Sequence, residues 1–545
     1  MATPTRPYHR HGRSQFFIEG EGPAPAAMLS PRQRKMAPGA AAAMEKANPP
    51  EDPKRAFRFC RLFPDLPKFQ PDDAGLIALG QALEDPFMPG AGDSVIPGGF
   101  TYLGQFVDHD ITFDRTEGIP DGSLDPAEIL QGRSPALELD SVYGRGPTKS
   151  PELYESDGRR LKIGTTTGRA TFGVTQPFPN DLPRTPLEDP ETPNSRRAII
   201  GDPRNDENLI VAQTHLAFLK FHNKVVERLQ GSGTAAGQLF EEARKTVVQH
   251  YQSIVLHDFV PRLTSHQVAD DVMKKGRKVY APKGPDPGTR LCMPVEFSVA
   301  AYRTGHSMIR NAYQWNRVFS STGPFGRPPG LNLFFVFSRV SGNLGGIDEA
   351  TNKPFLSLPS DWIADWRRMY DFSEQAGGTR HPQLNFTRQI DTRLANGLMM
   401  LPEFANADQP HLKTLAVRNL LRGRLVGLPT GQDVAKKVGA TVLTPEEVAS
   451  GPLGAVVTAQ GFDTKTPLWF YILKEAEVQQ GGQSLGEVGG RLVAETFHGL
   501  VQGSDHSILK QANWKPTLPA KNPDKFTMND LLLFVNEVNP LGDAP

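Results

Sequence analysis

The sequence predicts a mainly α-helical protein with long irregular loops and little β-structure. Two stretches, 209–229 and 235–260, place apolar residues along one helical stripe, which is typical of amphipathic helices. Gly and Pro together number 101 (52 plus 49), above the usual share of roughly 12%, and this favours helices joined by irregular loops. Residues 115–205 contain a proline-dense run and a run rich in Gly and Thr, so we expect them to wrap a helical scaffold.

Further helices are expected at 359–371, 413–424, 468–478 and 485–501, while 330–340 is compatible with a strand or a buried helix. Residues 1–55 mix Pro, Gly, Ala and basic residues without periodicity, so we expect an extended or disordered N-terminal arm. No internal repeat or clear linker divides residues 56–545, which are expected to form one large domain.

Composition excludes several classes of partner. Lys plus Arg and Asp plus Glu number 60 each, so the chain has no general attraction for nucleic acid or an anionic membrane. No apolar stretch reaches membrane-spanning length, and the N-terminus lacks a secretory apolar core. We therefore expect a cytoplasmic location, with secretion by a route that needs no cleavable signal as the alternative. Cys60 and Cys292 are expected to be free thiols in a reducing compartment, with a single disulfide as the alternative.

The stretch from Leu103 to Asp110 has an unusual arrangement of polar residues. If it is helical, Gln105, Asp108 and His109 stand at i, i+3 and i+4 and project from one side. Asp110 falls about 100° further round, among apolar positions. A carboxylate there needs a cation or several hydrogen-bond donors, which indicates a functional site. A partly exposed helix with a salt-bridged acid pair is the structural alternative.

Four other polar clusters each have a structural explanation when taken alone. The acids of 202–207 suit a helix N-terminus, and the basic residues of 418–424 suit a helix C-terminus. In 301–306, Arg303 and His306 lie one turn apart beside an apolar run, as a buried core histidine would. In 134–140, oxygens recur on alternate residues, which suits either a hard cation or a polar-faced strand.

Together, and in their order along the chain, these clusters resemble the animal-type haem peroxidases of the peroxidase-cyclooxygenase superfamily, which also has many bacterial members. Gly104-Gln-Phe-Val-Asp-His-Asp110 resembles the family's distal helix, and Asp202-x-Arg204-x-x-Glu207 resembles its catalytic arginine segment. Arg303-x-Gly-His306 resembles its proximal segment. The resemblance extends from about residue 57 to the C-terminal region, and it implies a single helical domain that binds haem b.

On the distal side, the resemblance implies that His109 moves a proton between the two oxygens of hydrogen peroxide. Arg204 is then expected to stabilise the charge that develops as the O–O bond breaks, and Gln105 to hold an ordered water or halide. On the proximal side, His306 is expected to bind the haem iron, with Asn419 accepting a hydrogen bond from its second ring nitrogen. Three arginines match residues that pair with haem propionates: Arg303, Arg422 and, less closely, Arg424.

The resemblance also implies covalent attachment and a calcium site. Asp108 and Glu207 stand where vertebrate members form ester bonds to haem methyl groups. Asn208 follows Glu207 where myeloperoxidase has a methionine that makes a third link, so the attachment is expected to resemble that of lactoperoxidase. The implied calcium ligands are Asp110, Ser134, the carbonyl of Ala136, Glu138 and Asp140. The loop departs from mammalian members, where an Asp and a Ser are usual in place of Glu138 and Asp140.

The expected function is that of a haem peroxidase, which uses hydrogen peroxide to oxidise halide, thiocyanate or phenolic donors through a ferryl intermediate. A fatty-acid dioxygenase of the same superfamily is the first alternative. Such enzymes carry a radical-forming tyrosine three residues before the proximal histidine, whereas this chain has Arg303 there and Tyr302 one residue off. An inactive calcium-binding adhesion scaffold is the other alternative. The sequence leaves the reducing substrate and the oligomeric state open.

Overall fold

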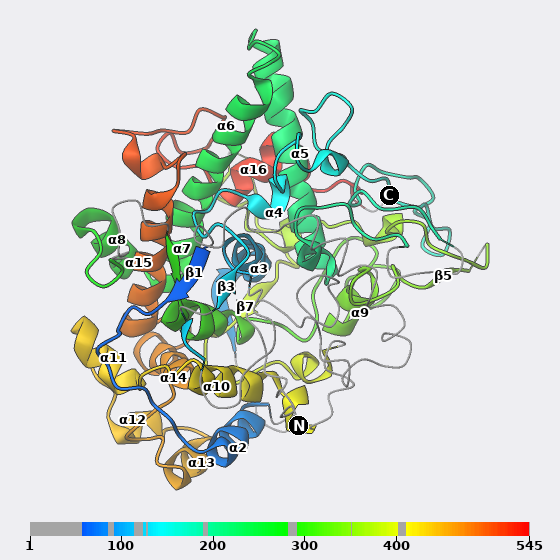
Figure 1. The fold of residues 1–545 in the computed structure, drawn as a ribbon. Coiled ribbons are helices and arrows are strands. Elements are labelled where there is room, and N and C mark those ends of the chain that lie inside the picture. Colours follow the sequence, from blue (N-terminus) through cyan, green and yellow to red (C-terminus); the bar gives the residue numbers. More distant parts are fainter. Residues whose placement is uncertain are drawn as a thin grey trace, which may run out of the picture.

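The computed structural model describes residues 57–84, 92–113, 124–126, 129–188, 195–281, 291–349, 351–375, 377–401 and 410–543. The N-terminal arm expected at 1–55 lies outside these residues. The described chain is mainly helical with little strand, which confirms the predicted fold class (Figure 1).

The helices and strands have the following bounds. The α-helices are α2 (Asp73–Leu83), α3 (Gly99–Ile111), α4 (Asp140–Tyr143), α5 (Leu209–Gly231), α6 (Leu239–Ile254), α7 (Val260–Thr264), α8 (His266–Lys275), α9 (Leu331–Val336), α10 (Leu415–Leu425), α11 (Gly431–Val438), α12 (Pro445–Val448), α13 (Gly454–Ala459), α14 (Leu468–Gln480), α15 (Glu487–Gly503) and α16 (Met528–Phe534). The 3-10 helices are η4 (Pro151–Leu153), η5 (Pro203–Asp206), η8 (Ala301–His306), η9 (Ser360–Trp362), η10 (Trp366–Arg368), η11 (Asn396–Met400), η13 (Pro410–Lys413) and η14 (Ile508–Lys510), and the π-helices are η6 (Val255–Phe259) and η7 (Glu296–Ala300). The strands are β1 (Phe57–Cys60), β2 (Asp93–Pro97), β3 (Leu130–Gln131), β4 (Cys292–Pro294), β5 (Ile347–Asp348), β6 (Lys353–Pro354) and β7 (Phe386–Arg388).

The strands of the described residues form three small sheets. One sheet has the order β3-β1-β4, with β1 antiparallel to β3 and parallel to β4. In the other two, β2 pairs with β7 and β5 pairs with β6, both antiparallel. The first sheet fixes the start of the domain against β4, which leads directly into the proximal segment.

Helix α3 lies at the centre of the molecule (Figure 1). Its apolar residues Leu103, Phe106, Val107 and Ile111 are fully buried, and Phe106 stacks on Phe218 of α5 with ring centroids 4.6 Å apart. The helix begins at a glycine because the backbone there approaches Tyr370 closely: a Cβ on Gly99 would lie 2.4 Å from its ring. This packing holds the side chains of α3 in fixed positions.

Most of the predicted helices are present. Helices α5, α10, α14 and α15 match their predicted ranges within a few residues, and 330–340 contains a helix, α9. The helix predicted over 235–260 begins at Leu239, changes to a π-helix at Val255 and continues as α7. π-Helical turns inside helices are frequent at functional sites.

The helix predicted over 359–371 is wrong. The segment forms two one-turn 3-10 helices, because its carbonyl oxygens bond elsewhere: Asn316 Nδ2 donates to the carbonyls of Asp361 and Ile363, at 2.7 Å each. The segment is buried on all sides, so its apolar residues carry no helical period.

The expectation of two free thiols is also wrong. Cys60 and Cys292 form a disulfide that joins β1 to β4 across 232 residues of sequence, with the Cα atoms 5.8 Å apart. The parallel pairing of β1 with β4 brings the two cysteines together. Nearby, the buried carboxylate of Glu296 accepts hydrogen bonds from the backbone N–H groups of Leu62 and Phe63.

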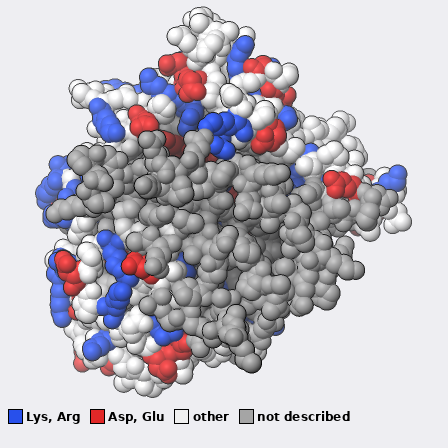
Figure 2. Space-filling model, viewed as in Figure 1, with Lys and Arg blue, Asp and Glu red and all other residues white. Residues whose placement is uncertain are grey.

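On the face shown in Figure 2, acidic and basic side chains are interspersed wherever the surface belongs to described residues, in line with the equal numbers of the two kinds of charge. Within the described part of the chain, no helix is long and apolar enough to cross a membrane.

Candidate functional site

A large cavity separates α3 from the short helix η8. Its empty volume, counted with its solvent-open mouth, is about 1020 Å³. His109 of α3 and His306 of η8 both line it. Much of the remaining wall is apolar and includes Phe100, Phe259, Leu263, Leu331, Phe335 and Leu415. The cavity therefore offers two imidazoles in a largely apolar surrounding.

The distal wall is built as the helical spacing predicts, because Gln105, Asp108 and His109 all line the cavity from α3. Gln105 Nε2 donates to Glu207 Oε1 (2.5 Å), and the same carboxylate oxygen lies 3.3 Å from His109 Nε2. Asn208, the N-cap of α5, donates from Nδ2 to Gln105 Oε1 (3.0 Å). Glu207 is thus next to the cavity residues, although it is not itself a lining residue.

The second ring nitrogen of His109 belongs to a buried chain of hydrogen bonds that was not predicted from the sequence. His109 Nδ1 lies 2.7 Å from Asn205 Oδ1, which can only accept, so Nδ1 carries the proton. Asn205 Nδ2 in turn donates to His215 Nδ1 (2.9 Å), and burial lowers the pKa of His215 to about 3, which keeps that ring neutral. In the neutral His109 ring this leaves Nε2 unprotonated and able to accept a proton.

Arg204 is buried, but it is not among the residues that line the cavity. Its guanidinium donates to both oxygens of Asp202 and to the backbone carbonyls of His109 and Thr112 at the end of α3. Burial alone would raise the pKa of Asp202, but Arg204 and Arg133 lower it far below its usual value. The observed contacts tie the arginine segment to α3, and the contact of Arg204 with peroxide stays a prediction.

On the proximal wall, His306 contacts Asn419, as predicted. The amide nitrogen of Asn419 lies 3.0 Å from His306 Nδ1. Asn419 Oδ1 accepts instead from Arg303 Nη1 (3.0 Å), whose Nε donates to the carbonyl of Ser298. The predicted direction, with the amide oxygen facing His306, is therefore not the one observed, because Arg303 occupies that oxygen.

Two arginines predicted near haem propionates lie away from the cavity wall. Arg422 is buried within α10 and is not a lining residue. Arg424 pairs with Asp73 of α2, with 2.8 Å between Nε and Oδ1, and its contact with a propionate stays a prediction. Arg303 does line the cavity.

The predicted calcium loop is a strained turn and contains no strand. Leu137 and Leu139 both have positive φ (56° and 59°) and are fully buried. Non-glycine residues take up this conformation at a cost, and such strain is concentrated at functional sites. Asp110 reaches the loop and accepts hydrogen bonds from Leu139 N, Ser141 N and Ser141 Oγ.

Two of the three predicted acidic ligands lie close together. Burial, together with the neighbouring charge of Asp140, raises the pKa of Asp110 to about 7. Asp140 Oδ2 accepts from Ser134 N (3.1 Å), while Ser134 Oγ accepts from Ala136 N (3.3 Å). Glu138 turns elsewhere: its Oε1 accepts from Ser504 Oγ and Asp505 N, at 2.9 Å each.

Among the described residues there is accordingly no cluster of three or more His, Cys, Asp or Glu side chains that could hold a metal ion. The ligand set is corrected in one respect, because the carboxylate of Glu138 anchors the loop to the end of α15.

Comparison with known proteins identifies the class. The sequence model described as "Animal haem peroxidase" matches residues 100–447, and the chain belongs to that family. It is 25% identical over 449 residues to a chorion peroxidase of Drosophila melanogaster, covering 77% of this chain and 50% of that protein. It is 28% identical over 194 residues to the thyroid peroxidase of Sus scrofa, covering 34% of this chain and 20% of that protein.

The chain thus spans half or less of the length of these relatives. Among solved structures, peroxidase A from Dictyostelium discoideum superposes with a TM-score of 0.58 at 14% identity, covering 91% of this chain and 97% of that one. This match shows that the fold is shared.

The cavity fits the haem that the family implies. An iron porphyrin needs a wide, mostly apolar slot with an axial nitrogen ligand. The structure provides a cavity of this character, with His306 on one wall and His109 on the other. Asn419 contacts the His306 ring in the position that partners of metal-binding histidines take, although its amide nitrogen, and not its oxygen, faces Nδ1.

Proposed function

We propose that this chain is a haem peroxidase, which uses hydrogen peroxide to oxidise a small donor: a halide, thiocyanate or a phenol. The observation that carries the proposal is the fixed tautomer of His109 in a cavity that also presents His306. Haem b, bound between them, would supply an iron centre able to accept oxidising equivalents from peroxide. The remaining chemistry belongs to the residues of the chain.

His109 is the group that moves the proton. Its Nε2 accepts a proton from one peroxide oxygen and returns it to the other, while Nδ1–H stays donated to Asn205. His215, behind Asn205, is neutral because burial lowers its pKa to about 3, so it adds no charge to this hydrogen-bonded chain. Gln105 lines the same wall, and we propose that it holds water or a halide there.

His306 would hold the haem iron through Nε2. In that state Nδ1 carries a proton, and an acceptor must face it. A half-turn of the Asn419 amide supplies the oxygen, and Arg303 is then released from Asn419 Oδ1. Arg303 already lines the cavity, so its guanidinium can pair with a propionate without leaving the wall, and Arg422 is the second candidate.

Two finer features belong to the same proposal. Asp108 lines the cavity, and Glu207 contacts both Gln105 and His109; these contacts support the proposal that the two carboxylates form esters with the haem. If both esters form during turnover with peroxide, acid-acetone treatment leaves the haem on the protein. Complete extraction of haem would contradict this.

Calcium is proposed to bind beside Asp110. The support is the pair of neighbouring carboxylates, the buried Asp110 and the half-buried Asp140, next to the strained turn at Leu137 and Leu139. A hard cation would balance the two charges and would fix the end of α3. Ser134 and the Ala136 carbonyl complete the proposed ligands, with Glu138 excluded.

The dioxygenase alternative depends on Tyr302, which does line the cavity. Its hydroxyl donates to the carbonyl of Gly104 (2.9 Å), and its ring stacks on Phe297 at 4.8 Å. A carbonyl is a poor proton acceptor, so this phenol is suited to linking η8 to α3. This contact favours the peroxidase over the radical-forming role. The presence of Gln105, Asp108 and His109 on one cavity wall favours it over the inactive scaffold.

The disulfide bears on where the protein works. Disulfides persist mainly in oxidising compartments, so we propose that the chain folds outside the reducing cytoplasm, against the default expectation.

The test is a comparison of haem-loaded wild type with His109→Ala, using the exposed His266→Ala as control. His109→Ala should retain the Soret band but react with peroxide about 10²–10⁴-fold more slowly, while His266→Ala should match wild type. An unchanged rate in His109→Ala would place the acid-base elsewhere.

A further inference from the structure

A cluster of buried aromatic side chains lies beside the cavity. It contains three of the five tryptophans of the chain, together with three tyrosines: Trp315, Trp362, Trp366, Tyr102, Tyr313 and Tyr370. Each has at most 3% of its surface exposed. Indole and phenol are the side chains that are most easily oxidised by one electron. Their clustering next to the proposed haem cavity therefore indicates electron transfer in addition to packing.

Two routes connect this cluster to the cavity wall. Tyr102 lines the cavity and makes an edge contact with Tyr313, with ring centroids 5.6 Å apart. Phe334 bridges Tyr313 and Trp315, at 5.8 and 5.1 Å.

The second route starts at Phe100, which also lines the cavity. Its ring lies 5.2 Å from that of Tyr370, which in turn lies 5.8 Å from Trp366. Trp366 contacts Trp315 at 6.5 Å, so both routes converge on these two indoles.

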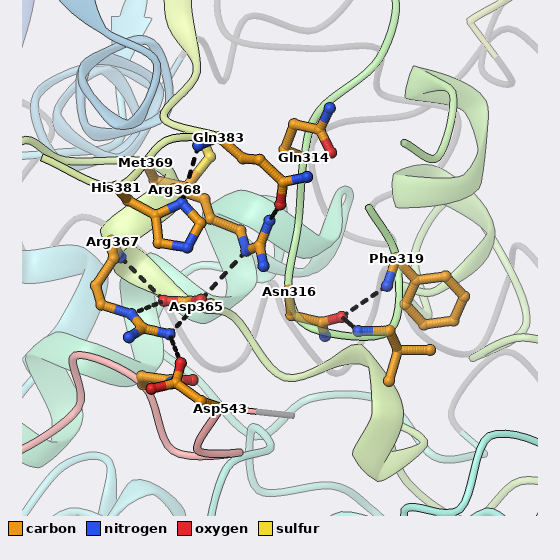
Figure 3. A network of polar contacts seen from close by, with 12 residues as sticks. Gln314, Asn316, Phe319, Asp365, Arg367, Arg368, Met369, His381, Gln383 and Asp543 are labelled. Carbon is orange, nitrogen blue, oxygen red and sulfur yellow. Dashed lines mark hydrogen bonds and ion pairs between the residues drawn. The ribbon is translucent and has the colours of Figure 1, made fainter. Parts of the chain in front are cut away.

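Residues that flank Trp315 and Trp366 in sequence belong to a polar network, which Figure 3 shows. Asn316, next to Trp315, accepts from the backbone N–H groups of Val318 and Phe319 (2.9 Å each) and donates to carbonyls of the 361–363 segment. Asp365 and Arg367 flank Trp366 in sequence, and Arg367 Nη2 donates to Asp543 (2.6 Å) near the C-terminus. Arg367 and Asp543 are solvent-accessible, with 27% and 77% of their side chains exposed.

We propose that Trp315 and Trp366 form an electron relay, which carries oxidising equivalents from the cavity to the surface around Arg367 and Asp543. The relay rests on the proposed peroxidase function, which supplies the oxidant. It gives the protein a second place to oxidise donors, and the donors it fits are molecules too large to enter the cavity.

Each step of the relay moves one electron. Trp315 would give one electron to the oxidant that peroxide generates in the cavity and would become an indole radical cation. Its Nε1 proton stays donated to the carbonyl of Trp362 (2.9 Å). Trp366 then reduces Trp315, and a one-electron donor at the surface reduces Trp366 and is itself oxidised.

Electrons pass along the tyrosines of the first route, but the radical does not stay on these tyrosines. Oxidation of a phenol requires loss of its proton to a base, and the contacts of Tyr313 supply none: its oxygen accepts from Arg310 N (3.0 Å), and Tyr102 hydrogen-bonds to it. Burial also raises the pKa of Tyr313. The radical therefore rests on the indoles.

The first experiment is freeze-quench electron paramagnetic resonance of the haem-loaded full chain, mixed with peroxide in the absence of donor. Trp is ring-deuterated, so that a tryptophan radical is recognised by its narrowed lines. Wild type and the control Trp514→Phe, whose ring packs on His250 apart from this cluster, should show the radical. The double variant Trp315→Phe, Trp366→Phe, which interrupts both routes, should lack it. An equal signal in the double variant, or lines unaffected by the label, would overturn the proposal.

The second experiment uses ferrocytochrome c, a protein too large for the cavity, and a small phenol as paired donors. In Trp366→Phe the rate with cytochrome c relative to the rate with phenol should fall about tenfold or more, with the Soret band retained. An unchanged ratio would overturn the relay. If wild type does not consume peroxide at all, the proposed function fails; if it consumes peroxide without a tryptophan radical, only the relay fails.

Discussion

Removing the Cys60–Cys292 disulfide should destabilise the protein measurably, and the size of the effect follows from the sequence separation. A crosslink across 232 residues removes chain entropy from the unfolded state. In the loop-closure treatment, that separation corresponds to about 5 kcal/mol at 25 °C. Unfolding a segment as long as 57–543 releases an entropy of about 1 kcal/mol/K, so the melting temperature should fall by about 5 °C.

The assay is differential scanning calorimetry of wild type and the Cys60→Ser, Cys292→Ser double variant, each with and without a reductant. Reductant should lower the melting temperature of wild type towards that of the variant and should leave the variant unchanged. The reasoning is refuted if the two proteins melt within about 1 °C of each other under oxidising conditions. It is also refuted if alkylation of the unreduced wild type under denaturing conditions modifies both cysteines.

Three further predictions concern the site and its surroundings. Asn205→Ala should slow the reaction with peroxide about 10–100-fold, because His109 loses the partner that fixes its tautomer. Stopped-flow absorbance measured across pH should also show a change in the slope of the rate against pH. An unaltered pH profile would contradict this. Calcium should raise the melting temperature of wild type above its value in a chelator, and Asp110→Ala should abolish this increase. A wild type that melts at the same temperature in calcium and in chelator would show that no calcium is bound. Burial raises the pKa of Glu84 from 4.5 to about 7, so the unfolded chain releases this proton first and stability falls as pH rises from 4.5 through 7. Glu84→Gln should therefore be more stable than wild type at pH 8 by about 3 kcal/mol and should lose that advantage near pH 4, as measured by urea titration; an advantage that does not depend on pH would contradict the assignment.

The parts of the site that were predictable from sequence are those set by local helical geometry. Gln105, Asp108 and His109 share a wall because i, i+3 and i+4 positions on a helix face one way. His306 on η8 lines the same cavity, an arrangement that was expected from the family resemblance and that spacing alone did not give.

The parts that sequence did not predict depend on contacts between distant residues. The 3-10 turns in 359–371 depend on the side chain of Asn316, and the turn of Glu138 away from Asp110 depends on Ser504, 366 residues later. The link from His109 through Asn205 to His215 had a partial signal, since Asn205 lies inside the conspicuous 202–207 segment. Nothing in the pattern showed which of its side chains would face α3.

The position of Arg204 shows a different limit. Motif spacing placed it in the correct segment, but the direction of its guanidinium is set by Asp202 and by carbonyls at the end of α3. A residue's place in a motif fixes its backbone neighbourhood, whereas the direction of a long side chain is decided by nearby charges.

The most direct test of the account is a haem titration of the full chain, followed by addition of hydrogen peroxide in a stopped-flow spectrophotometer, with His306→Ala alongside. The account predicts a Soret band in wild type that saturates at one haem per chain and shifts on mixing with peroxide, and a weakened, displaced band in His306→Ala. A chain that stays colourless after haem supplementation, or a His306→Ala variant with a wild-type Soret band and peroxide response, would contradict it.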